Sequence, residues 1–331
     1  MVVEGNYAAR HNLRDFFARK GNFSAPNGTF CATSGTGWTC QSAGSRATGK
    51  MDTMTSAVAP AIALTIAGSE ATGGAGAQAD LKTFQELGVF GIANLTCIVS
   101  FNPKDNWNHR FVPVDQQVIA DQLEATTAAY GAASGAPSVL DTVKIGMLGS
   151  PATISTVEKA LTDGSFKHVV LDPVLICKGQ EPGHALDTDQ ALKAQILPLA
   201  TFVTPNHFEA ESLSGLTITD EESLKAAAIR IHEISGAAVL AKGGVRLEGP
   251  DAVDVYYDGG TLEVLRAPKV GEVAVSGAGC SLAAAVTAEL AKGATPLEAA
   301  RTAKAFVTAG IKNRVSSGAP FDALWQGGAL S

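Results

Sequence analysis

A short turn near the C-terminus combines residue types that bind phosphate with a reactive thiol. Residues 276–281, Ser-Gly-Ala-Gly-Cys-Ser, separate a predicted strand at Gly271 to Val275 from a predicted helix at Leu282 to Lys292. Where a strand enters a helix through small residues, several backbone N–H groups and the positive end of the helix dipole point at one place. We therefore predict an anion hole here, with Cys280 where this field would hold a thiolate or steady a developing negative charge.

Polar side chains follow three other predicted strands. Asp172 ends one apolar strand, Asn206 and Glu209 follow the next, and Lys242 closes a third. Two carboxylates and an amide at one rim are hard oxygen ligands, which suit Mg²⁺ together with a nucleotide phosphate. Taken alone, each carboxylate would equally serve as a helix cap or a surface charge, and the lysine with its two following glycines would be a weak signal.

Three loops could complete a binding site. The loop 68–76 carries four glycines between a strand and a helix, which permits close backbone approach to a ligand, although its spacing fits neither a Rossmann fingerprint nor a Walker A loop. The polar loop 177–183 begins with Cys177 and would either close over a site and exclude water or be an ordinary mobile loop. Trp107 and His109 offer an aromatic wall and an imidazole, or simple surface packing.

These segments belong to a regular alternation of strands and helices that begins near residue 61. Apolar runs alternate with amphipathic stretches, which predicts a three-layer α/β fold with a doubly wound, mostly parallel sheet, flanked by helices and extended by a small β-hairpin. The predicted strands are 62–67, 92–99, 142–146, 168–172, 201–204, 237–241, 252–257 and 261–266. Four predicted helices have both ends defined, at 77–87, 115–129, 282–292 and 296–312. Three more are predicted: one that begins at Ser150, one around 190–196, and one that follows a capping box at 219–222 and ends at 234. Ligands of such sheets bind beyond the carboxyl ends of the strands, where the motifs fall.

Composition limits the class of function. The chain of 331 residues is 46% hydrophobic and 17% charged, its net charge is -7, and no apolar run is long enough to cross a bilayer. An acidic protein without a basic face is not expected to bind nucleic acid or a membrane surface. Five cysteines at scattered spacings fit neither a disulfide framework nor a zinc site, which indicates a reducing cytoplasm.

The first 55 residues differ from the rest of the chain. They are rich in Gly, Ser, Thr, Asn and Arg, show little periodicity and lack the apolar core of a secretory signal. We predict that residues 1–55 are an N-terminal extension, poorly structured or foreign to the natural protein, with Met51 or Met54 as a natural start, and that 56–331 form one domain. The alternative is a true N-terminal module.

In combination, the motifs resemble the ribokinase-like superfamily, and within it the hydroxymethylpyrimidine (phosphate) kinases and the short bacterial pyridoxal kinases. The likeness extends from about Ala61 to Lys312. It is carried by 64–69 (LTIAGS), 73–76 (GGAG), 78–84 (QADLKTF), 144–148 (KIGML), 172–174 (DPV), 204–206 (TPN), 242–244 (KGG) and 277–280 (GAGC).

This resemblance implies a kinase that uses ATP and Mg²⁺ to phosphorylate a hydroxymethyl group on a pyridine or pyrimidine ring, commonly as a homodimer. It implies that Cys280 takes the hydroxyl proton, where sugar kinases of the superfamily carry an aspartate, while the amides of 277–280 hold charge on the γ-phosphate. The implied site residues are Gly277, Ala278, Gly279 and Cys280 for catalysis; Gly68, Gly73, Gly74, Asp80, Phe101, His109, Met147, Val174 and Cys177 for substrate; Asn206, Lys242, Gly243, Gly244, Val245, Arg246, Asp254 and Gly279 for nucleotide; and Glu209 and Asp172 for metal.

Substrate choice depends on Phe101. Pyrimidine kinases of the family tend to carry a glutamine at this position, whose amide can pair with an aminopyrimidine, whereas a phenyl ring can only pack on the substrate ring. The following segment, 102–109, resembles the lid-side loop of the pyridoxal kinase branch. We therefore expect pyridoxal, pyridoxine or pyridoxamine first and hydroxymethylpyrimidine second, with dual use as a further option. Cys177 and Cys280 could also engage the pyridoxal aldehyde, so the sequence leaves open whether Cys280 is a base or an aldehyde trap.

Two departures from the family pattern leave other functions open. Val275-Ser276 replaces the usual Thr-His pair before the turn, and Ser69-Glu70 replaces Ser-Asp in the first glycine loop. A non-catalytic nucleotide- or vitamin-binding protein is one alternative, motivated by the missing histidine. A thiol-dependent transferase or hydrolase is another, but it needs a histidine beside Cys280, which only a fold contact from His207 or His109 would supply.

Overall fold

The computed structural model describes residues 30–34, 37–41, 59–136, 139–175 and 182–329. The chain separates into two compact units, Met1–Ala57 and Val58–Ser331. Within the first unit, β1 (Phe30–Ser34) and β2 (Gly37–Gln41) form an antiparallel hairpin in which Cys31 is the register partner of Cys40. The rest of the first unit lies outside the described residues, and the boundary near residue 55 stays a prediction.

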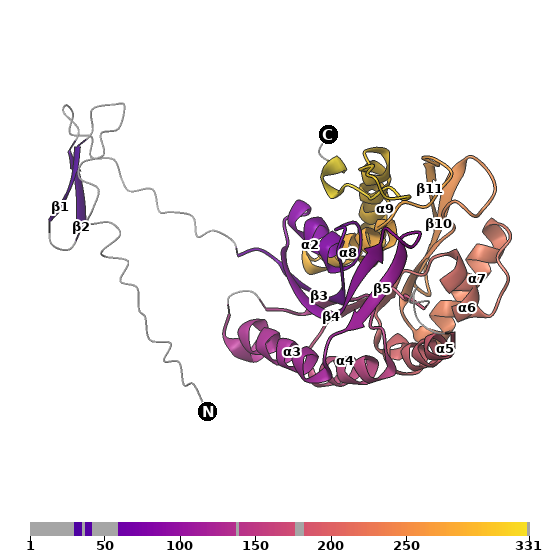
Figure 1. Ribbon diagram of the computed structural model, residues 1–331, viewed down its shortest axis with the longest axis horizontal. Helices are drawn as coiled ribbons and strands as arrows, with labels where there is room; N and C mark the ends of the chain where they lie inside the picture. The colour runs from indigo at the N-terminus through magenta and orange to yellow at the C-terminus, as the bar shows by residue number, and fades with distance from the viewer. Residues whose placement is uncertain (1–29, 35–36, 42–58, 137–138, 176–181, 330–331) are drawn as a thin grey trace. The chain divides into compact units, whose positions relative to one another are not determined.

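The second unit is built on one mixed sheet (Figure 1). Its nine strands are ordered β11-β10-β9-β8-β7-β6-β3-β4-β5. The six strands from β9 to β4 are parallel, and β10, β11 and β5 run antiparallel to their neighbours. The strands are β3 (Ile62–Glu70), β4 (Phe90–Asn102), β5 (Asn108–Pro113), β6 (Thr142–Ile145), β7 (His168–Leu171), β8 (Phe202–Val203), β9 (Ala238–Lys242), β10 (Asp251–Tyr257) and β11 (Leu262–Pro268).

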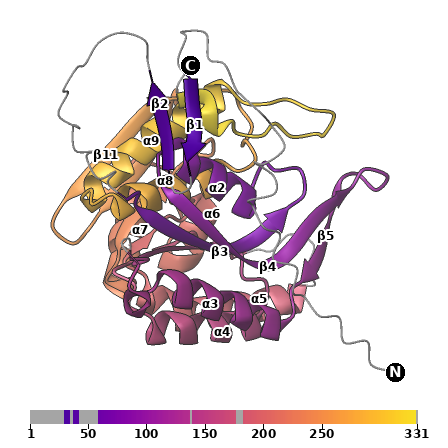
Figure 2. The same cartoon turned by 90° about the vertical axis from the view of Figure 1, so that its left-hand side faces the viewer.

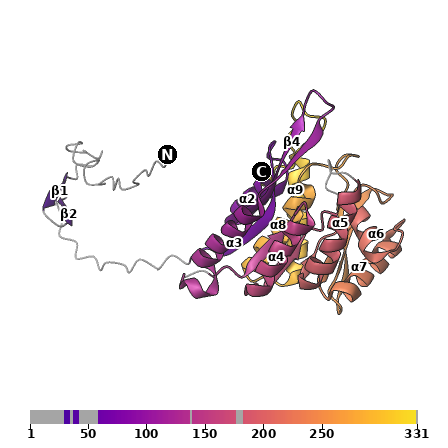
Figure 3. The same ribbon diagram turned by 60° about the horizontal axis from the view of Figure 1, so that its bottom comes forward.

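Helices cover both faces of this sheet, which gives the three expected layers (Figures 2 and 3). One face carries α2 (Gly76–Glu86), α8 (Ala278–Ala291) and α9 (Pro296–Lys312); the other carries α3 (Gln116–Tyr130), α4 (Pro151–Asp163), α5 (Pro182–Ala191), α6 (His207–Ser214) and α7 (Glu221–Ser235). A separate apolar core fills the space on each side, around Ile154 and Ile231 on the second face and around Val286 and Phe306 on the first. No helix in the described ranges has the length and apolar character needed to span a bilayer.

Most predicted elements are present within a few residues of their expected ends. α9 has the predicted bounds, because Thr295 and Glu298 form a capping box before a regular amphipathic stretch. The predicted strand at Gly271 to Val275 is wrong. Gly271 has a φ of +78° and the following three residues are exposed, so this segment joins β11 to α8 without a strand partner. Only Ser276 forms a single bridge, with Ala323.

The hairpin of β1 and β2 was not predicted, and in the second unit one strand and one α-helix were missed. The segment around Trp107 and His109, expected as a loop, leads into and includes β5, which pairs along the end of β4 so that Phe101 lies opposite His109. α6 is a short helix whose apolar residues are too few to show a period. It begins at the capping box of Asn206 and Glu209, residues that the sequence interpretation had assigned to nucleotide and metal.

Candidate active site

The turn at the start of α8 lies against the first glycine loop. Gly277 is the N-cap of α8, has a φ of +77° and offers no capping side chain. A Cβ on Gly277 would lie 1.7 Å from the carbonyl oxygen of Gly74, so only glycine fits. The start of α8 therefore has no side-chain cap, which is compatible with the predicted anion hole.

Cys280 lies in the first turn of α8 and is partly exposed. Burial raises the pKa of its thiol to about 11; Lys144 opposes this rise, Asp172 and Asp80 add to it, and the N–H of Gly76 lowers it. A thiol with this pKa is protonated at neutral pH, which favours the second of the two expected roles, to steady a developing negative charge, over a resting thiolate. Cys280 can act as a base only when further positive charge enters the site.

A fully buried ion pair lies below Cys280. The ammonium of Lys144 on β6 is 2.8 Å from both carboxylate oxygens of Asp80 on α2, and the hydroxyl of Thr65 on β3 donates to Asp80 at 2.6 Å. Burial lowers the pKa of Lys144, but the interactions with Asp80, Cys280 and Asp172 together outweigh burial and the net shift is upward. Lys144 is therefore a buried cation paired with Asp80, a contact that was not predicted from the sequence.

A second charged group flanks the turn. The Nζ atom of Lys242 lies 3.5 Å from the position that a Cβ on Gly279 would take, and 3.6 Å from a carboxylate oxygen of Asp172. Burial raises the pKa of Glu209 to about 7, while Lys242 lowers it and Asp172 raises it further. The side chain of Glu209 also accepts the N–H of Asn206 at 2.7 Å. The structure thus brings together a lysine and two carboxylates beside the anion hole.

The carboxylate of Glu70 shapes the first glycine loop. It accepts the N–H and hydroxyl of Thr72 and the N–H groups of Gly74 and Ala75, at 2.6 to 3.1 Å. Gln78 also bonds to this loop, through the Ser69 hydroxyl and the Glu70 N–H. The departure from Ser-Asp to Ser-Glu therefore has an internal role: the longer side chain organises the loop.

Aromatic side chains gather at the end of β4. Phe101 is partly exposed, and its ring centroid lies 4.7 Å from that of His109 and 6.5 Å from that of Trp107. Gly68 is a bulge in β3 next to β4, and a Cβ on it would lie 2.6 Å from the sulfur of Cys97. This close packing explains the glycine. Met147 and Val174, each partly buried, follow β6 and β7 at the same edge of the sheet.

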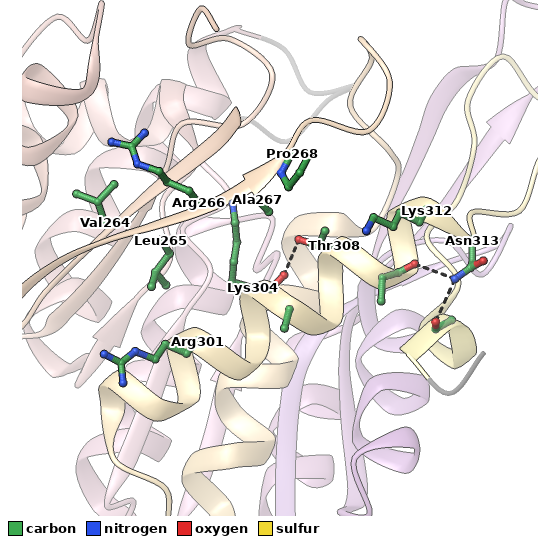
Figure 4. A pocket seen from close by; sticks show the side chains of 13 residues that line it. Val264, Leu265, Arg266, Ala267, Pro268, Arg301, Lys304, Thr308, Lys312 and Asn313 are labelled. Atoms are coloured by element: carbon green, nitrogen blue, oxygen red, sulfur yellow. Dashed lines mark hydrogen bonds between the residues drawn. The ribbon is translucent and has the colours of Figure 1, made fainter. Parts of the chain in front are cut away.

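A groove between β11 and α9 extends along the outer side of the molecule (Figure 4). It encloses about 660 Å³, and its lining includes Arg266, Arg301, Lys304, Thr308 and Lys312. Lys304 donates to the carboxylate of Asp254 at 2.8 Å, and Asp254 is the register partner of Lys242. The basic groove therefore begins one strand away from the lysine beside the anion hole.

Several predicted residues lie elsewhere than expected. Asp80 is fully buried in the ion pair and does not reach the surface of the site, and the buried carboxylate of Asp254 is occupied by Lys304. Cys177 lies outside the described residues. Gly73 and the loop residues Gly244, Val245 and Arg246 are partly or fully exposed at strand ends, whereas Gly243 is buried against Leu247. In the described ranges, no three His, Cys, Asp or Glu side chains gather as a metal site.

Comparison with known proteins identifies the family to which this chain belongs. The family model described as phosphomethylpyrimidine kinase matches residues 70–324, which include the glycine loop, the charged rim and the anion hole. The chain belongs to this family. Its relatives include the pyridoxine kinase of Bacillus subtilis, 46% identical over 255 residues that cover 76% of this chain and 90% of the relative. The hydroxymethylpyrimidine/phosphomethylpyrimidine kinase of Haemophilus influenzae is 39% identical, covering 77% and 92%.

Solved structures agree with this assignment. The pyridoxal kinase of Staphylococcus aureus in complex with AMP-PCP and pyridoxal has a TM-score of 0.73 at 38% identity, and the match covers 82% of this chain and 94% of that one. As a member of the phosphomethylpyrimidine kinase family, this chain is a phosphotransferase that acts on a hydroxyl group, with a ribokinase-like fold. The match to kinases favours phosphoryl transfer over the thiol-dependent alternative.

Backbone hydrogen bonds hold the chain at Ser276, the position where the family resemblance leads us to expect the histidine of a Thr-His pair. Ser276 donates its N–H to the carbonyl oxygen of Asp322 at 2.9 Å and accepts the N–H of Leu324 at 3.0 Å. The entry to the anion hole is thus fixed by a C-terminal segment rather than by a side chain on the turn itself. The residues after Lys312, including Asp322 and Leu324, were given no role from the sequence.

Proposed function

We propose that this chain transfers the γ-phosphate of ATP to the hydroxymethyl group of pyridoxal, pyridoxine or pyridoxamine. The observation that carries the proposal is Phe101, partly exposed at the end of β4 within an aromatic cluster. Such a wall packs on a pyridine ring and offers no amide to an aminopyrimidine. The pyridoxine and pyridoxal kinases among its relatives support the same substrate class.

The charged groups of the site suit the chemistry of phosphoryl transfer. Backbone N–H groups at the start of α8 would receive the transferring phosphate, and Lys242 beside Gly279 would bind its oxygens. Cys280 would accept the hydroxyl proton as a thiolate, once its own proton has left to solvent and positive charge has entered the site with the Mg²⁺ of ATP. We place the adenosine part of ATP towards the basic groove of β11 and α9, next to the Lys304–Asp254 pair.

Two carboxylates at the rim of the site, those of Asp172 and Glu209, are suitable ligands for Mg²⁺. Mg²⁺ is commonly held by one or two carboxylates together with substrate phosphates rather than by a complete protein cage, and Asp172 and Glu209 are carboxylates at the same rim. These two residues would hold the ion, which would neutralise charge on the phosphates. Glu209 must lose its proton first, because its pKa is about 7.

The second candidate is phosphorylation of hydroxymethylpyrimidine or its phosphate, in thiamine synthesis. The family match and the Haemophilus influenzae relative favour it. A panel assay separates the two: pyridoxal, pyridoxine, pyridoxamine and hydroxymethylpyrimidine are compared under identical ATP and Mg²⁺. We expect kcat/KM to be at least about tenfold higher for a vitamin B6 form. A preference for the aminopyrimidine would overturn the main proposal, and ligand binding without product would favour a non-catalytic role.

The Phe101→Gln variant tests the selecting residue. It supplies the amide that pyrimidine kinases tend to carry, so the substrate ratio should move towards hydroxymethylpyrimidine. Phe101→Leu is the matched control, since it removes the aromatic face and adds no amide. Equal ratios in the wild type and the Gln variant would remove Phe101 from substrate selection.

We also propose that the enzyme is a cytoplasmic homodimer. Ile98 on β4 and Val112 on β5 are register partners, and 42% and 59% of their surfaces are exposed. A partner subunit would cover this apolar pair. Light scattering on the purified protein would test the dimer, and a monomeric mass would contradict it.

A further inference from the structure

The C-terminal segment contributes an aromatic ring to the wall formed by the β4–β5 hairpin. The ring centroid of Phe321 lies 5.0 Å from that of Phe101 and 6.0 Å from that of Trp107. The first pair is tilted and the second is edge-to-face, both favourable geometries for aromatic contacts. Phe101 therefore contacts both His109 of its own hairpin and Phe321, which is more than two hundred residues away in the sequence.

The position of Phe321 is fixed from the other side by the anion hole. The next residue, Asp322, accepts the N–H of Ser276, and its side chain pairs with Arg314 at 2.7 Å. Ala323 exchanges two backbone hydrogen bonds with Val315, at 2.8 and 2.9 Å. The backbone directly after Phe321 is thus tied to the residue that precedes Gly277.

The same segment also touches the first glycine loop. The methyl group of Ala323 lies 3.1 Å from the position that a Cβ on Gly74 would take. Three parts of the site therefore meet residues 321–324: the hairpin with Phe101, the glycine loop and the turn that begins α8.

We propose that Phe321 is a positioning residue for substrate, which holds Phe101 against the bound ring and ties that wall to the phosphate-transfer turn. The proposal rests on the proposed function for the identity of the ring. Loss of the Phe321 ring would leave Phe101 free to turn away, because the remaining contacts to Trp107 and His109 belong to the same hairpin and move with it. The ATP site would keep its own contacts.

The test is steady-state kinetics of Phe321→Ala and Phe321→Leu with pyridoxal and ATP varied separately. We expect the KM for pyridoxal to rise about threefold to tenfold, the range that an aromatic pair supplies, while the KM for ATP stays unchanged. Phe321→Tyr, which retains the ring, should restore the wild-type KM. Phe90→Ala is the matched control, because Phe90 is an exposed phenylalanine that packs against Tyr130 at the start of β4.

A double-mutant cycle with Phe101→Leu completes the test. If Phe321 acts through Phe101, its substitution adds little in the Phe101→Leu background. A full, additive effect there, an equal rise in both KM values, or an unchanged pyridoxal KM would each overturn the proposal. If the wild type phosphorylates only hydroxymethylpyrimidine, the proposed substrate fails, and the same measurements with that substrate still decide the role of Phe321.

Discussion

Lys144 and Asp80 form an ion pair that has no contact with solvent. The ammonium lies 2.8 Å from both carboxylate oxygens, and both side chains have an exposure of 0%. Removing two charges from water is costly, and only the close geometry and the added hydrogen bond from Thr65 offset that cost. Because the pair joins α2 to the central strand β6, it fixes the floor of the site.

Loss of one partner should therefore be severe. We expect Lys144→Met to lower the free energy of unfolding by about 3–5 kcal/mol, because it leaves the Asp80 carboxylate buried without a cation. Urea unfolding would measure this change. Lys225→Met is the matched control, since Lys225 pairs with Glu221 and Glu222 on the surface of α7 and its loss should have a far smaller effect. Similar losses in the two variants would contradict a structural role for the pair.

Removal of the Cys280 thiol should impair chemistry more than binding. General base catalysis contributes about 10²- to 10⁴-fold, so Cys280→Ala should lower kcat by a factor in that range. The N–H groups of the turn belong to the backbone and remain, so ATP affinity, measured by calorimetry, should change little. A variant with the wild-type rate would exclude Cys280 from catalysis.

The same thiol should react slowly at neutral pH. Since its pKa is about 11, the thiolate fraction and the alkylation rate with iodoacetamide should rise about tenfold for each pH unit between 7 and 10. Mass spectrometry of the peptide that contains Cys280 separates this thiol from the other four cysteines. A rate that levels off below pH 9 would show that the thiol is more acidic than its buried surroundings indicate.

Glu209 should make stability depend on pH. The folded state raises its pKa from 4.5 to about 7, so the folded protein binds a proton that the unfolded chain has released over this range. The contribution of Glu209 to the free energy of unfolding should therefore fall as pH rises from 4.5 to 7, by an amount on the order of 2 kcal/mol. The measurement is urea unfolding at several pH values.

Glu209→Gln provides the control for this prediction. Glutamine can keep the capping box with Asn206 but does not titrate, so the variant should gain stability relative to the wild type as the pH rises through this window. A constant difference between the two proteins from pH 4.5 to 7 would show that Glu209 keeps an ordinary pKa.

The sequence predicted the layered fold well because its strands are short, apolar and separated by regular amphipathic stretches. It predicted a strand at 271–275 because valines alternate there, but a segment beyond the edge strand β11 has no neighbour to pair with. β5 was missed because its residues are mostly exposed and polar. Edge strands of this kind depend on their partner rather than on their own pattern.

The turn that begins α8 could be predicted because it is one contiguous motif, and the charged rim because each of its residues lies at or shortly after the end of a predicted strand. The Lys144–Asp80 pair could not be assigned, although a lysine between Val143 and Ile145 was a signal of a buried partner. The contact of Phe321 with Phe101 gave no signal at all, because it joins residues that are distant in the sequence and follow no period.

The four hydrogen bonds that Glu70 accepts have a consequence for ligand capture. A glycine-rich segment would ordinarily sample many backbone conformations and lose that freedom when a guest arrives. Here the Glu70 carboxylate already accepts the N–H groups of Thr72, Gly74 and Ala75, so most of the ordering of this loop takes place during folding. The loop is therefore preorganised before the ligand binds, and the binding affinity is not reduced by a loss of backbone entropy on binding.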